Sequence, residues 1–380
     1  MLSYPRRKFI RDLSLVMLAT HGLTSLAGYN SPVKKEKNSD KEKAQGKLGI
    51  ALVGLGMYST GQLAPALTQT QHCYLAGIVT GSPEKAENWK KEYDIPDRNI
   101  YNYRDFDSIK DNPDIDIIYV VLPNSMHAEY TVRAAKAGKH VICEKPMAIT
   151  VEECDRMIAA CKNAGRMLSI GYRLHFEPYN KEMMRLGQQK IFGALKRLQA
   201  ENGMKDVKGW RLVKEMAGGG PLMDLGIYCV QGVRYTTGME PIAVTAKEGP
   251  KTDPEKFKTI EETLNFRMEM PDGIVADCMC SYSKEANLLR AEAEQGWFQL
   301  SLSYSYKGIK GETSRGKMNF PEVNHQALQM DDFAQAIKNN RPSPVPGEMG
   351  RQDVKILQAI YRAMNSWQRV EIGPWGATEQ

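Results

Sequence analysis

The chain has 380 residues, with 51 basic and 45 acidic side chains and a formal net charge of +6 at pH 7. This length is enough for two domains that each bury a core of their own. Residues 1–27 hold four basic side chains against one acidic, so three of the six net charges belong to this segment. The remainder has no basic stripe, and the composition therefore gives no support to nucleic-acid binding.

The seven cysteines form no Cys-x-x-Cys pair, and Cys278 and Cys280 are separated by a single residue. On a strand that spacing puts both thiols on one face. We expect buried free thiols, in preference to metal ligation or a disulfide framework.

Residues 1–27 have the three parts of an export signal. Arg6-Arg7-Lys8 precedes a short apolar stretch at residues 13–19, and Ser25-Leu26-Ala27 offers small residues at a cleavage position. The arginine pair predicts a Tat signal peptide, hence the Tat translocase as a partner during export and a periplasmic location. An amphipathic surface helix is the other interpretation. The apolar stretch is too short to be a stable membrane anchor.

Residues 28–46 lack apolar periodicity and predict a solvated, flexible arm. From Lys47 onward, strands and helices alternate as far as residue 171. We expect strands near 48–53, 74–79, 115–122, 139–143 and 167–171, and helices near 61–70, 83–93, 126–138 and 151–164. This alternation predicts an α/β domain over 47–171, a Rossmann domain whose parallel sheet is doubly wound.

The sequence pattern is different over 172–380, where hydrophobic and polar residues alternate in several stretches. We expect strands near 194–202, 242–248, 260–269, 274–283 and 297–306, and helices near 178–187, 325–338 and 351–366. The pattern predicts an α+β domain with an open, largely antiparallel sheet, which would bind substrate and mediate oligomerisation, with its last helices packing back on the first domain.

The segment Ile50–Tyr58 combines an aliphatic run with Gly54-Leu55-Gly56 and a following helix. Glycines at these positions allow a tight turn and a close approach of the backbone to a pyrophosphate. Gly-x-Gly alone often marks only a turn, and Ser59 stands at the third glycine position. The strand–turn–helix context favours dinucleotide binding.

The second strand ends at Val79 without a carboxylate that could bind the 2′-hydroxyl of NAD. Instead, Thr80, Ser82 and Lys85 offer two hydroxyls and a cation, which suit the 2′-phosphate of NADP. NADP is therefore preferred over NAD. The other interpretation is that Ser82 only caps the helix and Lys85 is solvated.

Three further segments carry chemistry. Residues 122–127 follow the most buried strand, at the sheet edge where ligands bind in such folds. His127 in this segment could contact the cofactor or could equally have only a structural role. Lys145 lies in Glu144-Lys145-Pro146 at the next strand end. Ala217–Tyr228 holds three glycines followed by Asp224 and Tyr228, which at i and i+4 would share a helix face. From spacing alone this is an ordinary glycine-rich loop and amphipathic helix.

These segments together resemble the Gfo/Idh/MocA oxidoreductase family, and within it the exported glucose–fructose oxidoreductase group. The similarity runs from about Lys47 to Val370. It rests on Leu122-Pro123-Asn124-Ser125, Ala137-Gly138-Lys139-His140-Val141, Glu144-Lys145-Pro146-Met147-Ala148, Gly171-Tyr172-Arg173, Trp210-Arg211-Leu212, Asp224-Leu225-Gly226-Ile227-Tyr228, Gln352-Asp353-Val354 and Gln358-Ala359-Ile360-Tyr361. Tyr228 stands where most of the family carries His.

The resemblance implies roles for individual residues. Catalysis would fall to Lys145, Asp224 and Tyr228, and sugar contacts to Arg173, Tyr172 and Lys145. The cofactor would be held by Gly54, Gly56, Met57, Tyr58, Thr80, Ser82, Lys85, Leu122, Pro123, Asn124, His127, Glu144, Lys145, Arg173, Trp210 and Arg211. No metal is expected, and the family's open sheet implies a homodimer or homotetramer.

The resulting prediction is a periplasmic, NADP-dependent sugar oxidoreductase, which could oxidise one sugar and reduce another with a retained cofactor. Two other classes stay open: a glycosidase of the same fold that acts by transient oxidation with bound NAD and elimination, and a non-catalytic sugar-binding protein. In this group a proline-rich arm wraps a neighbouring subunit, whereas the arm of this chain is rich in lysine. The segment between Glu201 and Trp210 is also shorter than in that group.

Overall fold

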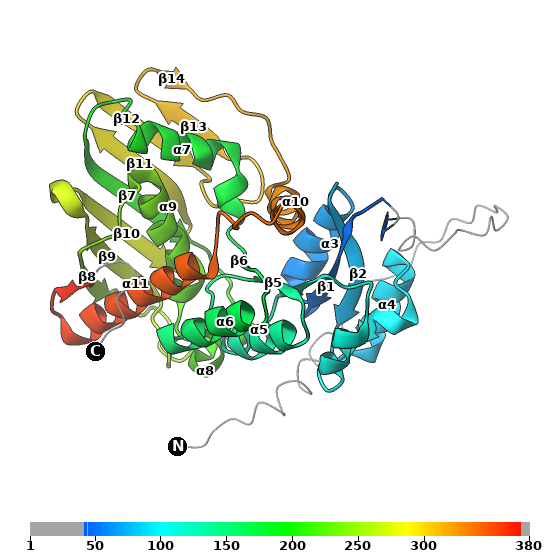
Figure 1. Cartoon of the computed structure of the whole chain (residues 1–380). Helices are drawn as coiled ribbons and strands as arrows, with labels where there is room; N and C mark the ends of the chain where they lie inside the picture. Colours follow the sequence, from blue (N-terminus) through cyan, green and yellow to red (C-terminus); the bar gives the residue numbers. More distant parts are fainter. Residues whose placement is uncertain (1–41, 44, 374–380) are drawn as a thin grey trace, which may run out of the picture.

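Two sheets organise the computed structural model, which describes residues 42, 43 and 45–373 (Figure 1). The signal peptide and most of the arm therefore lie outside the described residues. One sheet has six strands in the order β3-β2-β1-β4-β5-β6, and the other has nine in the order β14-β13-β12-β11-β7-β10-β9-β8-β15. The predicted combination of a Rossmann sheet and a larger, mainly antiparallel sheet is confirmed.

The six-stranded sheet is parallel throughout, and its central strands are buried on both faces. Its strands are β1 (Leu48–Val53), β2 (Cys73–Val79), β3 (Ile100–Tyr101), β4 (Ile117–Val120), β5 (His140–Cys143) and β6 (Leu168–Ile170). The helices between them are α3 (Ala64–Leu67), α4 (Pro83–Tyr93), α5 (His127–Lys136) and α6 (Val151–Asn163). The strand order brings the carboxyl ends of β1, β4 and β5 together at one edge.

The nine-stranded sheet is antiparallel except where β10 pairs with β7. Its strands are β7 (Leu195–Gly203), β8 (Ala243–Glu248), β9 (Thr263–Glu269), β10 (Val275–Ser281), β11 (Ala286–Ala293), β12 (Gly296–Ser301), β13 (Lys310–Thr313), β14 (Gly316–Lys317) and β15 (Val370–Glu371). Helices α7 (Pro178–Gln188), α9 (Ile227–Thr237) and α11 (Gly347–Ser366) cover one face (Figure 1).

Four of these strands, β11, β13, β14 and β15, were not expected from the sequence. Strand β11 is built from Ala, Leu, Arg and Glu, which favour helix in isolation, and its pairing with β7 and β12 overrides that preference. The strand expected over 297–306 ends at Ser301, because Leu302 has a left-handed φ of 52° that turns the chain. The loop that follows carries Tyr304 and Tyr306.

The last two long helices pack against the first domain, and α11 packs against the second sheet as well. Helix α10 (His325–Lys338) contributes Met330 and Phe333 to a core shared with Leu63 and Ile78. The Asp331 carboxylate also accepts hydrogen bonds from the backbone N–H groups of Gln71 and His72. All seven cysteines lie in the described part of the chain, buried and free, as expected. Among the described residues, no helix is both long and apolar enough to cross a membrane.

Candidate active site

The glycine turn after β1 has the geometry that a dinucleotide cradle requires. Gly54 has a φ of 94°, and a Cβ there would lie 2.4 Å from the carbonyl oxygen of Val121. A Cβ at Gly56 would meet nothing within 4 Å, so this part of the turn is open to a ligand. Ser59 replaces the third glycine of the motif and closes the turn by donating from Oγ to the Gly54 carbonyl at 2.6 Å.

The end of β2 places polar side chains next to the glycine turn. Ser82 does cap α4, since its Oγ accepts a hydrogen bond from the Lys85 backbone N–H at 3.3 Å. The Lys85 side chain is not simply solvated, because its Nζ donates to the Leu55 carbonyl at 3.1 Å. The residues at this strand end therefore gather a cation and the hydroxyls of Thr80 and Ser82 beside the glycine turn.

His127 holds two strand ends together. Its ring nitrogens each lie 2.8 Å from a backbone carbonyl oxygen, that of Leu122 and that of Pro146, and the residue is 1% exposed. Burial lowers the pKa of this imidazole. His127 therefore supports these two strand ends, and its predicted contact with the cofactor stays a prediction. The neighbouring Asn124 donates to the Ala217 carbonyl at 2.8 Å and joins this loop to the second domain.

Lys145, Asp224 and Arg211 form the charged centre of the site. Lys145 Nζ donates to the backbone carbonyl of Asp224 at 2.7 Å and lies 3.4 Å from its Oδ1, while Arg211 Nε donates to Oδ2 at 2.8 Å. Burial alone would raise the pKa of Asp224, but Arg211 and Lys145 together lower it to about 2. The carboxylate is therefore ionised and fixes both cations. Tyr282 adds a hydrogen bond to Oδ2 at 3.2 Å.

Tyr228 lies directly beside these cations. The Lys145 ammonium is 4.3 Å from the centre of its ring, and the Arg173 guanidinium is 5.4 Å from it. Tyr228 and Asp224 do not share one regular helix, as the i, i+4 spacing suggested. Asp224 belongs to the π-helical turn η7 (Leu222–Gly226), and α9 begins only at Ile227. A π-turn of this kind often marks a functional site.

Arg173 is nearly fully buried, at 2% exposure, on the far side of Tyr228. Its guanidinium donates to the carbonyls of Tyr304 at 2.5 Å and Ser305 at 3.1 Å. It also lies 4.5 Å from the ring centre of Tyr306. The Tyr306 ring stacks on Tyr58, which follows the glycine turn, at a centroid distance of 5.9 Å. Aromatic rings from the two domains therefore meet beside Arg173.

Sequence reasoning missed Tyr282, Tyr304, Tyr306 and His325. The last accepts a hydrogen bond from Arg173 at its Nε2, at 3.2 Å. Two of these tyrosines lie in the loop that was expected to be a strand. No motif marks Tyr304 or Tyr306, so only their contacts with Arg173 reveal them.

Glu144 turns inward. Its carboxylate accepts hydrogen bonds from the Tyr119 hydroxyl at 2.6 Å and the Lys145 backbone N–H at 3.2 Å, and burial raises its pKa. A Cβ at Gly171 would lie 2.5 Å from Glu144 Oε1, so this glycine makes room for the carboxylate. The remaining predicted residues, Met57 and Trp210, are exposed and half-buried respectively.

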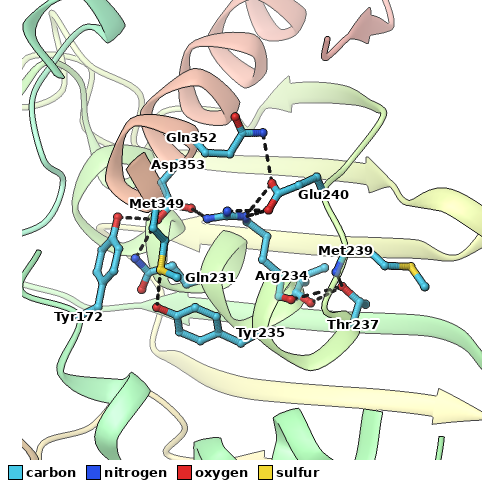
Figure 2. Close-up of polar contacts among 11 residues, drawn as sticks. Tyr172, Gln231, Arg234, Tyr235, Thr237, Met239, Glu240, Met349, Gln352 and Asp353 are labelled. Carbon is cyan, nitrogen blue, oxygen red and sulfur yellow. Dashed lines mark hydrogen bonds and ion pairs between the residues drawn. The ribbon is translucent and has the colours of Figure 1, made fainter. Parts of the chain in front are cut away.

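The structure corrects the prediction for Tyr172. Its hydroxyl does not face Lys145 or Tyr228 but donates to Asp353 at 2.5 Å, inside a separate buried polar network (Figure 2). The glycines at 219 and 220 allow other parts of the protein to approach the backbone closely. A Cβ at Gly219 would lie 1.9 Å from the Tyr361 hydroxyl, and one at Gly220 would lie 2.6 Å from the Glu261 carbonyl oxygen, so they admit protein groups.

The comparisons with known proteins agree with this geometry. Residues 48–172 match the profile described as "Oxidoreductase family, NAD-binding Rossmann fold", and residues 181–298 match the "GFO/IDH/MocA C-terminal domain". The chain belongs to the Gfo/Idh/MocA family. It is therefore an oxidoreductase that depends on a nicotinamide nucleotide.

Individual relatives of the family cover most of the chain. The crystal structure of aldose-aldose oxidoreductase from Caulobacter crescentus, complexed with glycerol, is 40% identical with a TM-score of 0.83, and covers 86% of this chain and 100% of that one. The D-xylose 1-dehydrogenase [NADP(+)] of Haloarcula marismortui is 26% identical over 85% of this chain and 92% of its own length. Scyllo-inositol dehydrogenase from Lactobacillus casei, at 20% identity over 86% of this chain and 99% of that one, shares the fold with a TM-score of 0.70.

Proposed function

We propose that the protein is an NADP-dependent sugar oxidoreductase that transfers hydride between a sugar carbon and the nicotinamide. The observation that carries this proposal is the convergence of Lys145, Asp224 and Tyr228 at the carboxyl edge of the first sheet, with Arg173 beside them. The similarity to an aldose-aldose oxidoreductase and a xylose dehydrogenase supports a sugar as the substrate.

Each side chain has a separate task in this proposal. Lys145 binds the reacting sugar oxygen and stabilises the negative charge that develops on it, and Tyr228 exchanges the proton of that oxygen. Asp224 holds the Lys145 ammonium in place through its backbone carbonyl and its carboxylate. Arg173 would bind sugar hydroxyls. When bound, the nicotinamide supplies the hydride acceptor or donor.

The cofactor that we propose is NADP. The Lys85 ammonium beside the glycine turn and the hydroxyls of Thr80 and Ser82 favour a phosphate, and the strand end itself, residues 79–82, holds no carboxylate. The xylose dehydrogenase relative is also named for NADP(+). Gly54, Gly56 and the backbone at Leu122–Asn124 would hold the rest of the nucleotide.

We propose further that the protein is exported by the Tat pathway and works in the periplasm. No nicotinamide pool supplies that compartment, so a retained nucleotide would have to cycle between two sugars. The similarity to an aldose-aldose oxidoreductase supports such a cycle. A homodimer or homotetramer would form through the polar open face of the nine-stranded sheet, where Arg197, Arg267 and Asp277 form an ion-pair ladder across three strands.

The test is a half-reaction with the purified protein. The nucleotide released by denaturation is identified by mass, and aldoses are then added to native protein while the absorbance of the reduced nicotinamide is followed. Reduction by one sugar and reoxidation by a second supports the proposal. Release of an aglycone without net nucleotide change would instead identify the glycosidase, and binding without any absorbance change would identify a sugar-binding protein.

A further inference from the structure

Asp353 on α11 is the centre of a buried polar network (Figure 2), which includes none of the three residues of the charged centre, Lys145, Asp224 and Arg211. The residue is 0% exposed. Its Oδ2 accepts hydrogen bonds from the Tyr172 hydroxyl at 2.5 Å and from Gln231 Nε2 at 3.0 Å. Its Oδ1 accepts from the Arg234 guanidinium at 2.5 Å. One carboxylate thus holds three side chains from two other segments.

The partners of Asp353 are attached directly to the sugar site. Tyr172 immediately precedes Arg173 in the chain. Gln231 and Arg234 lie about one and two turns after Tyr228 on the same helix, α9. Asp353 therefore connects the segment that carries Arg173 to the helix that carries Tyr228, two groups whose guanidinium and ring centre lie 5.4 Å apart.

Two carboxylates, those of Asp353 and Glu240, bind the guanidinium of Arg234 in this network. The Arg234 side chain is 5% exposed, and it is also bound by Glu240, whose Oε1 accepts from NH2 at 2.6 Å. Gln352, the neighbour of Asp353, donates to Glu240 at 3.2 Å. Burial alone would lower the pKa of the Arg234 guanidinium, but the carboxylates of Asp353 and Glu240 raise it by more than that. The pKa therefore lies above its usual value. Removing either carboxylate takes one ion pair away from a buried cation, which is costly.

We infer that Asp353 is a positioning residue, which sets the distance between Arg173 and Tyr228 in the sugar site. This inference rests on the proposed function. It also gives a role to Gln352 and Asp353, which take no part in the proposed catalytic chemistry. Its physical basis is that reaction rates fall steeply when groups move from their productive positions by as little as an ångström.

The experiment compares Asp353→Asn with a matched control, Glu240→Gln. Each change removes one negative charge from Arg234, so both variants should lose thermal stability, but Glu240 makes no contact with Tyr172 or Gln231. At a temperature where every variant is folded, Asp353→Asn should lower kcat/KM for the sugar about 10- to 100-fold. Glu240→Gln should leave it near the wild-type value, and both should bind NADP normally.

A double-mutant cycle then separates positioning from general damage. Tyr172→Phe removes only the hydroxyl that binds Asp353, and it should lower kcat/KM in the wild type but have little further effect in an Arg173→Ala background. Equal losses for Asp353→Asn and Glu240→Gln, or additive effects of Tyr172→Phe and Arg173→Ala, would overturn the inference. A wild-type protein inactive on every sugar would overturn the proposed function and this inference with it.

Discussion

Lys145 and Tyr228 meet across the two domains, with the ammonium 4.3 Å from the centre of the ring. Lys145 follows β5 of the first sheet, whereas Tyr228 begins the helix that covers the second. The pair therefore exists only when both domains are docked. This arrangement couples the reacting group of the substrate domain to the strand end where the nicotinamide would lie.

The first prediction concerns Tyr228. Tyr228→Phe removes one oxygen and keeps the ring against Lys145, so the fold and nucleotide affinity should be nearly unchanged. If Tyr228 transfers the proton, the single-turnover rate of sugar oxidation should fall by about 10²–10⁴. Lys145→Ala should cost a similar factor, and the double variant much less than the product, because the two residues act as a unit. A Tyr228→Phe enzyme with a near-normal rate would contradict the assignment.

The second prediction concerns nucleotide selection. Lys85→Ala removes the cation beside the glycine turn and should weaken NADP far more than NAD, by roughly 1.5–3 kcal/mol for one charge-assisted hydrogen bond. Isothermal titration with both nucleotides measures the difference. Lys91→Ala is the matched control, because it removes an exposed charge from the same helix at its far end. Equal losses for NADP and NAD in Lys85→Ala would show that this strand end does not read the phosphate.

The sequence predicts the first domain well because its signals are local. Buried aliphatic runs, the Ser82 and Thr150 caps and the glycine turn each act within a few residues, and the structure has strands and helices at those places. The second domain is less predictable, since the strand β11 depends on partners from distant segments. Local composition carries no information about such pairing.

The residues of the site likewise fall into two groups, those that sequence motifs predict and those that only the three-dimensional structure reveals. Lys145 and Asp224 could be found because they stand in recognisable motifs, and the structure brings them together. Tyr306 and His325 reach the site only through the path of a loop and the start of α10. Tyr172 was misplaced because its neighbour Arg173 lies in the site, whereas its own ring points to Asp353. Motif membership does not give side-chain direction.

The third prediction concerns the proposed export, for which residues 1–27 would be the signal. Replacing Arg6 and Arg7 together by Lys conserves the charge but removes the pair that the Tat pathway reads. The precursor should then accumulate uncleaved in the cytoplasm, as measured by fractionation and immunoblotting. Normal delivery of mature protein to the periplasm would exclude the Tat assignment while leaving the proposed chemistry untouched.

The fourth prediction concerns stability in acid. Burial and, to a smaller extent, Lys181 lower the pKa of His175 from 6.5 to about 4. Between those values the unfolded chain binds more protons than the folded one, so stability is present above pH 6.5 and is lost as the pH falls toward 4.

His175→Phe keeps a ring against Phe176 and Tyr235 and removes this titration. The free energy of unfolding, measured in urea at several pH values, should therefore fall less steeply below pH 6.5 in the variant, by up to about 1.4 kcal/mol per pH unit. His140 and His325, whose pKa values are also lowered, keep part of the slope. An identical slope in the two proteins would contradict the prediction.

The last prediction concerns the glycine loop that leads to Asp224. The Tyr361 hydroxyl donates to Glu261 at 2.8 Å and accepts from the Gly220 N–H at 3.2 Å, while Glu261 also binds the Leu222 N–H at 3.1 Å. This clamp leaves no room for a methyl group at Gly219, where a Cβ would lie 1.9 Å from the hydroxyl.

Gly219→Ala should therefore destabilise the protein by about 1–3 kcal/mol, as overpacking does, and should also lower sugar turnover because Asp224 follows the displaced segment. Gly61→Ala is the control, since a Cβ there meets nothing within 4 Å and the residue lies in a helical turn. It should change the free energy of unfolding by less than about 1 kcal/mol. Equal stability of the two variants in urea would show that Tyr361 moves aside for the methyl group. The hydrogen bonds of Tyr361 and Glu261 would then not fix the conformation of the glycine loop.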